Sequence, residues 1–164
     1  MSDIALANAA AYAARHHLRL AERLGFGIHG TVHVAHYEGK RDHSAIKALN
    51  SEEFFLRERA AYERLRDAAV SEVRGFQVPQ LIRAEADLWV VEMTIVNRPF
   101  VLDFAGPYLD ARPEFSQGIW AEWEADKRDQ FGERWSMVRA VMDAFEELGI
   151  YLVDVTPTNI RFAD

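Results

Sequence analysis

The stretch "LGFGIHGTVHVA", residues 24–35, decides the fold, because it joins a glycine-rich turn to a strand-like run. Gly25, Gly27 and Gly30 form the pattern Gly-x-Gly-x-x-Gly. These glycines fall between two predicted strands and not between a strand and a helix, which argues against a dinucleotide-binding fold. Glycines at such a turn let backbone N–H groups approach phosphate oxygens, because no Cβ atom obstructs them. On these residues alone, an ordinary glycine-rich hairpin is the alternative.

The sequence around this turn predicts an antiparallel sheet. Apolar residues alternate with other residues, as they do in β-strands, at Leu18, Leu20, Val32 and Val34. With a hairpin turn at "EGKRD", residues 38–42, we expect three antiparallel strands within 18–49. Two further strands are predicted at 80–85 and 88–95, and the second is rich in β-forming residues.

Helical patterns precede, interrupt and follow these strands. They predict helices over residues 3–16, 51–67, 114–131 and 133–148. Asn50 is the expected N-cap of the second helix, with Glu53 as its capping-box partner, and Gly149 is the expected C-cap glycine of the last. The order of elements predicts an α+β fold, with a β-rich half at 1–96 and a helical half at 97–164 packed as one compact unit.

Lys47 is the first charged residue that the pattern places in an apolar setting. Strand alternation puts it on the same face as Ala45 and Leu49, so its ammonium group is expected to be buried. On the helix predicted at 51–67, Glu58 lies in the middle of an apolar stripe. A carboxylate there needs a cation, and Lys47 is the economical partner. The alternatives are an edge lysine that reaches water and a solvated glutamate at the edge of the stripe.

The closing stretch "GIYLVDVTPTNIRFAD", residues 149–164, holds Asp154 and Asn159 between apolar segments. Pro157 forces an irregular connection between the two, so both are expected on a loop. Such a pair suits a base that accepts a hydroxyl proton and an amide that binds a metal. An Asx-turn that only shapes the loop is the alternative.

Taken in order, these features resemble the signature set of protein kinases, which aminoglycoside and choline phosphotransferases share. The glycine turn resembles the glycine-rich loop, "AIK" the third-strand lysine motif, and the run around Glu58 resembles helix C. "LWVVEMTI" resembles the fifth strand running into the hinge that binds adenine, and "MDAFEELGIYLVDVTPTNIRF" resembles helix E with the catalytic loop. The resemblance covers residues 18–98 and 133–162.

The resemblance implies a protein kinase-like fold, with a five-stranded antiparallel N-lobe sheet, helix C and a reduced helical C-lobe that ends after the catalytic loop. It implies ATP and Mg²⁺ as ligands, with Asp154 as the catalytic base and Asn159 as a catalytic residue and metal ligand. The residues implied to contact the nucleotide are Gly25, Gly27, Gly30, Val32, Lys47, Glu58, Glu92 and Thr94.

The sequence departs from the family pattern at the catalytic loop and after it. The family's His-Arg-Asp triplet reads Leu152-Val153-Asp154, and Thr156 replaces the loop lysine of protein kinases. The family's metal-binding Asp follows well downstream of the loop Asn, but only five residues follow Asn159, and Asp164 comes too early for that role. Carboxylates that would have to replace this ligand are Asp164, Asp103 and Asp110.

Composition argues against several classes of function. The formal net charge is −7, whereas a binder of phosphate backbones carries a basic patch, so no nucleic acid partner is expected. The chain has no cysteine, which excludes disulfides and thiolate metal sites and suits a cytoplasmic protein. No apolar run approaches the roughly 18 residues of a membrane span, so no membrane partner is expected.

Two groups of residues carry weaker predictions. The histidines of the segment 29–43 are expected at the surface of strands and loops and not in a metal site; they are His29, His33, His36 and His43. The aromatic-rich segment 115–135 is expected in the packing of two helices. Its alternative is an apolar patch that binds a protein partner or a second copy of the chain.

Three functions are open on the sequence alone. The first is a minimal kinase-like, ATP-binding phosphotransferase that uses Asp154 and Asn159. The second is a pseudokinase, a regulatory module that binds a nucleotide or a protein without catalysis. The third is a kinase fold kept as a scaffold without a ligand. The sequence therefore leaves open whether the protein is an enzyme.

Overall fold

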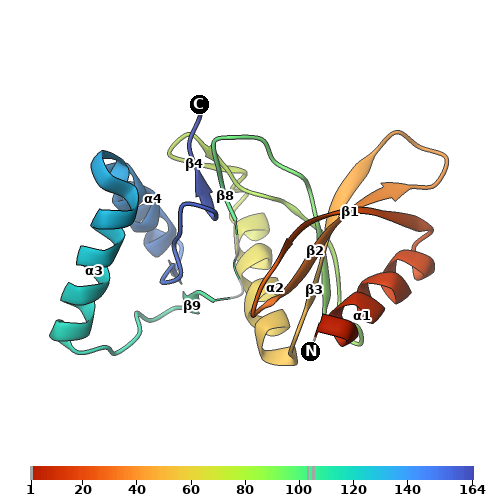
Figure 1. Ribbon diagram of the computed structural model, residues 1–164, viewed down its shortest axis with the longest axis horizontal. Coiled ribbons are helices and arrows are strands. Elements are labelled where there is room, and N and C mark those ends of the chain that lie inside the picture. Colours follow the sequence, from red (N-terminus) through yellow and green to blue (C-terminus); the bar gives the residue numbers. More distant parts are fainter. Residues whose placement is uncertain (1, 103, 105) are drawn as a thin grey trace.

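The computed structural model describes residues 2–102, 104 and 106–164. It is a mixed α+β structure with a five-stranded antiparallel sheet, as the order of elements predicted. The sheet and helix α1 lie at one end of the molecule, helices α3 and α4 lie at the other, and helix α2 stands between them (Figure 1).

The large sheet has the strand order β1-β2-β3-β7-β6. Its strands are β1 (Leu18–Phe26), β2 (Gly30–Tyr37), β3 (His43–Leu49), β6 (Leu81–Glu85) and β7 (Val90–Met93). The first three are consecutive antiparallel neighbours, and β7 pairs antiparallel with both β3 and β6. All five strands confirm the sequence prediction, although the last two are shorter than predicted.

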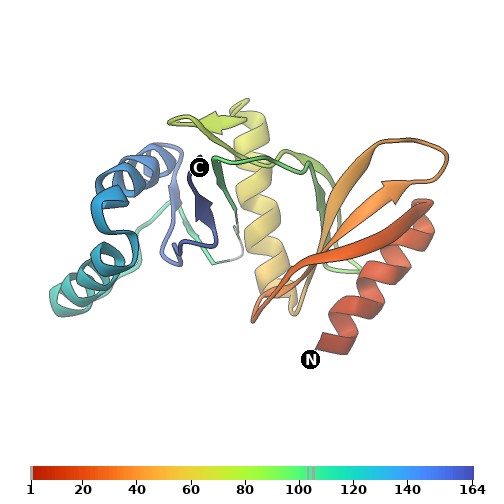
Figure 2. The same ribbon diagram turned by 45° about the horizontal axis from the view of Figure 1, so that its top comes forward.

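Each face of this sheet is covered by one helix. Helix α1 (Ser2–Arg15) and helix α2 (Glu52–Asp67) lie on opposite sides of it (Figure 2). Along β3, Ile46 and Ala48 belong to the apolar cluster under α1, while Ala45 and Leu49 belong to the cluster that includes α2. The predicted alternation of β3 is therefore confirmed, because side chains of successive strand residues point to opposite faces.

The N-terminus of α2 corrects the predicted cap. Ser51 is the N-cap: its backbone is extended, with φ −152° and ψ 157°, and its hydroxyl accepts a hydrogen bond from the N–H of Phe54. The cap predicted at Asn50, with Glu53 as its partner, is wrong because the helix begins one residue later. The Asn50 side chain turns instead toward the β1–β2 turn.

The helical half is built on α3 (Gln117–Phe131) and α4 (Trp135–Glu147), joined by a 3-10 turn over Gly132–Arg134. Both helices were predicted, and Gly149 follows α4 with φ 73°, the left-handed conformation of a C-cap glycine. The buried face of α4 consists of Trp135, Val138, Val141, Met142 and Phe145.

Short strands connect the two halves. They are β4 (Glu72–Val73), β5 (Phe76–Gln77), β8 (Phe100–Val101), β9 (Tyr108–Leu109), β10 (Ile150–Tyr151) and β11 (Ile160–Arg161). One small sheet has the order β11-β8-β5-β4, and β10 pairs with β9. The region 97–112 contains two of these short strands, β8 and β9. The pairing of β11 with β8 brings the end of the chain beside the segment that follows β7.

One apolar core runs through both halves. It includes Leu49 of the sheet, Tyr62 of α2, Phe145 of α4 and Ile160 of β11, each at most 1% exposed. In the aromatic-rich segment 115–135, Phe131 is buried as predicted, whereas Phe115 is 38% exposed. Binding of a protein partner or self-association through this half stays a prediction. Among the residues described here, no helix has the length and apolar character needed to cross a bilayer.

Candidate functional site

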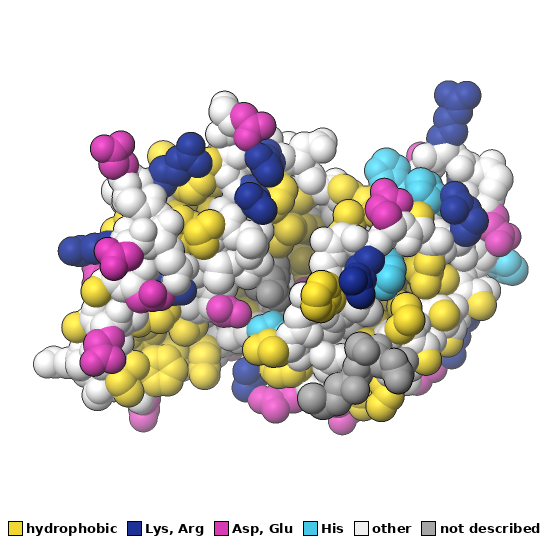
Figure 3. Space-filling view, viewed as in Figure 1, with side chains coloured by type: hydrophobic (Ala, Val, Ile, Leu, Met, Phe, Trp, Pro, Cys, Tyr) yellow, Lys and Arg dark blue, Asp and Glu magenta, His cyan; other side chains and the backbone are white. Residues whose placement is uncertain are grey.

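A cleft of about 830 Å³ lies between the two halves of the molecule. Figure 3 shows the surface hollowed between the helical side on the left and the sheet side on the right. The predicted site residues that line this cleft are Gly25, Gly27, Gly30, Val32, Lys47, Glu58, Thr94, Asp154 and Asn159. Residues far apart in the sequence therefore meet at one cavity, and Glu92 is the exception among the predicted set.

The β1–β2 turn forms one wall of the cleft, and its three glycines differ in what they require. A Cβ atom built on Gly30 would lie 2.1 Å from the carbonyl oxygen of Ala48, so glycine is needed there for the close approach of β3. Built on Gly25 or Gly27, it would meet nothing within 4 Å. Contacts within the fold therefore account for Gly30, and they do not account for the other two glycines.

Asn50 ties this turn to the end of β3. Its side-chain amide donates to the carbonyl oxygens of Ile28 at 2.9 Å and Gly27 at 3.4 Å, and its backbone N–H donates to the carbonyl of His29 at 2.9 Å. This role of Asn50 was not predicted from the sequence. It could have been inferred from the neighbouring Ser51, which is itself a good N-cap and so leaves the Asn50 side chain for another partner.

Lys47 and Glu58 form the predicted ion pair. The Lys47 ammonium lies 2.8 Å from Oε2 and 3.1 Å from Oε1 of Glu58. Glu58 is 0% exposed and Lys47 is 7% exposed, so the pair is almost completely removed from water. Both residues line the cleft, which places a cation with its buried counter-ion in the wall. The alternatives of a lysine at the sheet edge and a solvated glutamate are excluded.

The side chain of Glu92 does not line the cleft, and a contact of Glu92 with a nucleotide stays a prediction. Its carboxylate accepts hydrogen bonds from Tyr12 at 2.6 Å, from Ser44 at 2.8 Å and from Tyr37. These partners lie on the face of the sheet that α1 covers. The physical reason is strand parity: the next residue, Met93, lines the cleft, so Glu92 must point to the opposite face.

Thr94 follows Met93 and lines the cleft. Its hydroxyl accepts from the backbone N–H of Gln80 at 2.8 Å, and its own N–H donates to the carbonyl oxygen of Gln80 at 2.9 Å. The side chain of Thr94 thus fixes the backbone after β7. The cleft continues along this segment through Ile95 and Val96.

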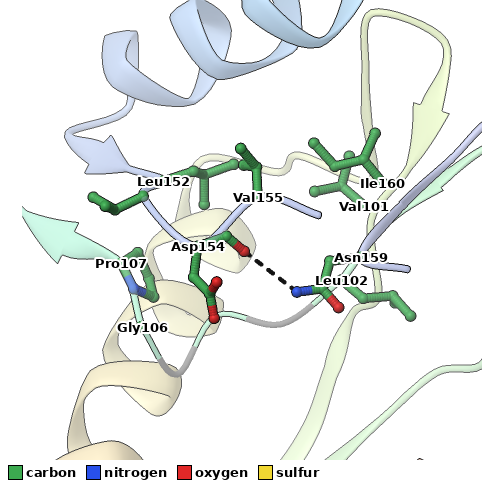
Figure 4. Close-up of a pocket in the computed structure, with 10 residues that line it drawn as sticks. Val101, Leu102, Gly106, Pro107, Leu152, Asp154, Val155, Asn159 and Ile160 are labelled. Carbon is green, nitrogen blue, oxygen red and sulfur yellow. Dashed lines mark hydrogen bonds between the residues drawn. The ribbon is translucent and has the colours of Figure 1, made fainter. Parts of the chain in front are cut away.

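Asp154 and Asn159 lie on the loop between β10 and β11, opposite the glycine turn. Figure 4 shows the amide nitrogen of Asn159 directed at the backbone carbonyl of Asp154, 3.3 Å away, while the Asp154 carboxylate points away from this contact. The loop closes on itself through hydrogen bonds from the N–H groups of Asn159 and Ile160 to the carbonyl of Thr156, both at 3.0 Å. Both polar side chains therefore project from a constrained turn.

Two residues outside the loop hold it in place. The indole N–H of Trp123 donates to the carbonyl of Val153 at 3.0 Å, and the backbone N–H of Leu102 donates to the carbonyl of Asn159 at 2.8 Å. The sequence analysis assigned Trp123 only to the packing of two helices. Its bond to the residue before Asp154 could not be foreseen, because it depends on where α3 lies relative to the loop.

Of the three carboxylates that the sequence offers as a further metal ligand, two are bound to arginines and one lies outside the described residues. Asp110 accepts from Arg64 at 2.7 Å, and this hydrogen bond holds the pKa of the carboxyl below its usual value. Asp164 accepts from Arg98 at 2.8 Å. Asp103 lies outside the described residues. Within the ranges 2–102, 104 and 106–164, no group of three His, Asp or Glu side chains has the arrangement of a metal site.

The loop nevertheless offers oxygen ligands of the kind that Mg²⁺ prefers. These are the carboxylate of Asp154 and the amide oxygen of Asn159, which line the same cavity wall. Mg²⁺ in phosphate-transferring sites is bound by one or two such side chains together with substrate phosphates and water. The residues therefore fit a magnesium ion that arrives with a phosphate ligand, and they do not form a cage for the ion alone.

The histidine prediction needs a correction for two of its four residues. His33 is only 9% exposed, and its ring lies 3.1 Å from the hydroxyl of Thr31. His29 is half-buried and lines the cleft. Surface positions were expected from the alternating pattern, but the β1–β2 turn folds over the cavity and carries His29 into it.

Both apolar and polar groups line the cleft. The apolar side chains include Val32, Ala45, Met93, Ile95 and Leu102, and the polar groups are the glycine turn, the ion pair and the Asp–Asn loop. In a chain of net charge −7, the lining cations Lys47, Arg98 and Arg161 exceed the lining carboxylates Glu58 and Asp154. No family model, curated protein or solved structure matches the chain. The functional argument therefore rests on this geometry.

Proposed function

We propose that the cleft binds ATP with Mg²⁺, and that the chain has a protein kinase-like fold with α2 as helix C. The observation that carries the proposal is the buried Lys47–Glu58 pair, which opens on the same cavity as the glycine turn and the Asp154–Asn159 loop. Kinase-like phosphotransferases combine these three parts around the phosphates of their nucleotide. The cations Lys47 and Arg161 in the lining also favour an anionic ligand.

The apolar and polar groups of the lining suit different parts of the nucleotide. Val32, Ala45 and Leu102 offer apolar side chains to a flat base. Gly25 and Gly27 leave room for phosphate beside the backbone, because a Cβ atom on either would meet nothing within 4 Å, although the N–H of Gly27 already donates to the carbonyl of Gly30 at 2.9 Å. An ammonium carries three N–H donors, so Lys47 is able to hold Glu58 and a phosphate oxygen together.

We assign phosphoryl transfer to a hydroxyl acceptor as the reaction. The acceptor oxygen forms a bond to the terminal phosphorus while the bond from that phosphorus to the bridging oxygen breaks, and ADP leaves with the electron pair. The Asp154 carboxylate takes the acceptor's proton, and Asn159 fixes the loop that presents it. Magnesium held by Asn159 would neutralise charge on the phosphate oxygens.

A binding module without catalysis is the second candidate, and one observation favours it. The carboxylates of Asp110 and Asp164 are each committed to an arginine, so neither adds to the oxygen ligands of the Asp154–Asn159 loop. A site with fewer metal ligands binds a nucleotide but neutralises the transferring phosphoryl group less well. The two candidates agree on nucleotide binding and differ on turnover.

Nucleotide binding is tested by thermal unfolding with Mg²⁺–ATP, with ATP and EDTA, and with buffer alone. A ligand that binds only the folded state stabilises it by about 2.7 kcal/mol at a concentration of 100 times Kd. We expect the largest rise in melting temperature with Mg²⁺–ATP and a smaller rise for Asn159→Ala. Asp87→Asn, which changes an exposed carboxylate near α1, is the matched control and should behave as wild type. No rise with either ligand would exclude the proposal.

Turnover is tested separately with ATP labelled at the terminal phosphate. We expect labelled product or phosphate from the wild type, and its loss in Asp154→Asn, with the ATP-dependent thermal shift retained in both. Equal turnover in wild type and variant would remove Asp154 from the reaction. A wild type that binds ATP but releases no label would select the binding module.

A further inference from the structure

We propose that the imidazole of His29 contacts the terminal phosphoryl group of the bound nucleoside triphosphate. This inference rests on the proposed function. It adds to the triphosphate site a residue, His29, that is not one of the motif residues given above. It is carried by the position of His29 on the β1–β2 turn, by the contacts that fix its ring, and by its place opposite Asp154.

His29 is the least exposed of the large side chains by which the turn lines the cavity, the others being Leu24, Phe26 and Ile28. The larger apolar residues before it, Leu24, Phe26 and Ile28, are 53%, 77% and 79% exposed. Gly25 and Gly27 alternate with them and carry no side chain. His29 follows in the same alternation as the glycines, is half-buried, and lines the cleft. A ligand below the turn therefore meets backbone at the two glycines and an imidazole at His29.

Two contacts hold the His29 ring and backbone. The ring lies edge-on against the ring of Phe54, with centroids 4.6 Å apart and an interplanar angle of 66°. The backbone carbonyl of His29 accepts from the N–H of Asn50 at 2.9 Å. Phe54 is in the first turn of α2, one helical turn before Glu58. The ring is thus positioned by the same helix that supplies the counter-ion of Lys47.

The ring faces the catalytic loop across Gly106. The point where a Cβ atom of Gly106 would lie is 3.5 Å from Cε1 of His29 and 3.7 Å from Cβ of Asp154. His29 and Asp154 therefore lie on two sides of one small volume beside Gly106, and both line the cleft. In the proposed reaction, Asp154 must lie beside the acceptor hydroxyl, and the acceptor must lie beside the terminal phosphorus. The terminal phosphoryl group accordingly comes next to His29.

An imidazole at this position supplies what the loop lacks. A neutral imidazole donates one N–H and an imidazolium donates two, and a hydrogen bond from a charged donor to phosphate is roughly twice as strong as a neutral one. The loop residues that line the cleft are Asp154, Thr156, Thr158 and Asn159, and none of them carries a positive charge that would neutralise phosphate. His29 moves no proton in this proposal: its N–H donates to a phosphoryl oxygen before and after transfer.

The test compares the affinities for Mg²⁺–ATP and Mg²⁺–ADP by calorimetry in the full chain. The variants are His29→Ala, His29→Phe, which keeps a ring against Phe54 but has no donor, and His29→Gln, which keeps an N–H donor. His43→Ala removes an exposed histidine of β3 and is the control. We expect Ala and Phe to weaken ATP binding about tenfold, with ADP binding changed less than about twofold. Gln should recover part of the loss.

The outcomes separate this inference from the proposed function. A wild type that binds neither nucleotide defeats the proposed function, and the assignment of His29 falls with it. A wild type that binds both, with His29→Phe losing ATP and ADP affinity equally, retains the proposed function and overturns the assignment. The same holds if His29→Phe keeps full preference for ATP. Melting temperatures without a nucleotide show which variants fold, and His29→Phe is chosen because the ring contact with Phe54 is conserved in it.

Discussion

The two faces of the five-stranded sheet each bury a carboxylate completely, and they balance it by different means. Glu58 of α2 and Glu92 of β7 are both 0% exposed. On the cleft face, Glu58 is paired with the ammonium of Lys47 at 2.8 Å. On the α1 face, Glu92 accepts hydrogen bonds from the hydroxyls of Tyr12, Tyr37 and Ser44.

This difference separates a binding surface from a supporting one. An ammonium beside a cavity has donors for a ligand oxygen as well as for its counter-ion, so the cleft face is suited to an anion. The hydroxyl residues Tyr12, Tyr37 and Ser44 do not line the cleft. Their hydrogen bonds to Glu92 join α1 to the strands β2, β3 and β7. We infer that Glu58 supports ligand binding and that Glu92 stabilises the sheet and its packing against α1.

Removing the cation should have the largest effect on stability. Lys47→Met leaves the Glu58 carboxylate buried without its ammonium, which typically costs about 3–5 kcal/mol. We expect the free energy of unfolding, measured by urea denaturation at neutral pH, to fall by that amount. Nucleotide binding, measured by calorimetry below the unfolding transition, should be lost as well.

The double variant Lys47→Met, Glu58→Leu is the matched control for this loss. Replacing both members of a buried ion pair by apolar residues is often neutral or stabilising, so the double variant should recover most of the stability. It should not recover nucleotide binding. If the double variant is as unstable as Lys47→Met, the cost lies in packing and the buried charge is not its source.

Glu92→Ala is expected to have the second-largest effect, of about 3 kcal/mol. It leaves the hydroxyls of Tyr12 and Ser44 buried without their acceptor, and each such group costs about 1–3 kcal/mol. Urea denaturation measures the loss, and Glu92→Gln is the control, since its amide oxygen still accepts from a hydroxyl. The folded variant should bind ATP as wild type does. Weaker ATP binding in folded Glu92→Ala would contradict the division between the two faces.

The two carboxylates also show how far the sequence leads. Glu58 was identified from spacing alone, because its place in an apolar stripe after a strand with a buried lysine depends on residues only 11 positions apart. Glu92 was assigned to the nucleotide by resemblance to a hinge strand. Its true partner Tyr12 lies 80 positions away, on a helix whose place over the sheet no local pattern gives.

The fold itself was largely predictable, and the details of the site were less so. Strand and helix periods gave all five strands of the large sheet and helices α1 to α4, because burial on one face repeats along each element. Asn50 and His29 were misassigned, since their roles depend on how the β1–β2 turn folds over the cavity. The alternation of side chains along a strand was the signal that was not used. If Met93 points into the cleft, its neighbour Glu92 must point to the opposite face of the sheet.

At alkaline pH, the tyrosines on the α1 face should contribute less to the free energy of unfolding. Burial, and then the hydrogen bond to Glu92, raises the pKa of Tyr12 in the folded protein, and burial also raises the pKa of Tyr37. The unfolded chain therefore releases these protons at a lower pH, near 10, so the folded state is favoured below that pH and loses its advantage above it. We expect a decline of about 1.4 kcal/mol per pH unit for each tyrosine.

Urea denaturation between about pH 8 and 11 measures this decline, and Tyr12→Phe is the comparison. The variant should be less stable than wild type near neutral pH, because one hydrogen bond to Glu92 is lost, and its stability should fall less steeply above about pH 10. Parallel pH curves for wild type and Tyr12→Phe would refute the role of Tyr12.

Tyr37→Phe should have the smallest effect, and it sharpens the comparison within the hydroxyl cluster. Tyr37 is half-buried, whereas Tyr12 is 0% exposed, so water can replace the hydroxyl of Tyr37 near Glu92 but not that of Tyr12. We expect Tyr37→Phe to lower the free energy of unfolding by less than about 1 kcal/mol, and Tyr12→Phe to lower it by more. Urea denaturation of both variants at neutral pH provides the measurement. If Tyr37→Phe is the more damaging, the carboxylate is stabilised chiefly from the exposed side, and Glu92 is not the internal counterpart of Glu58.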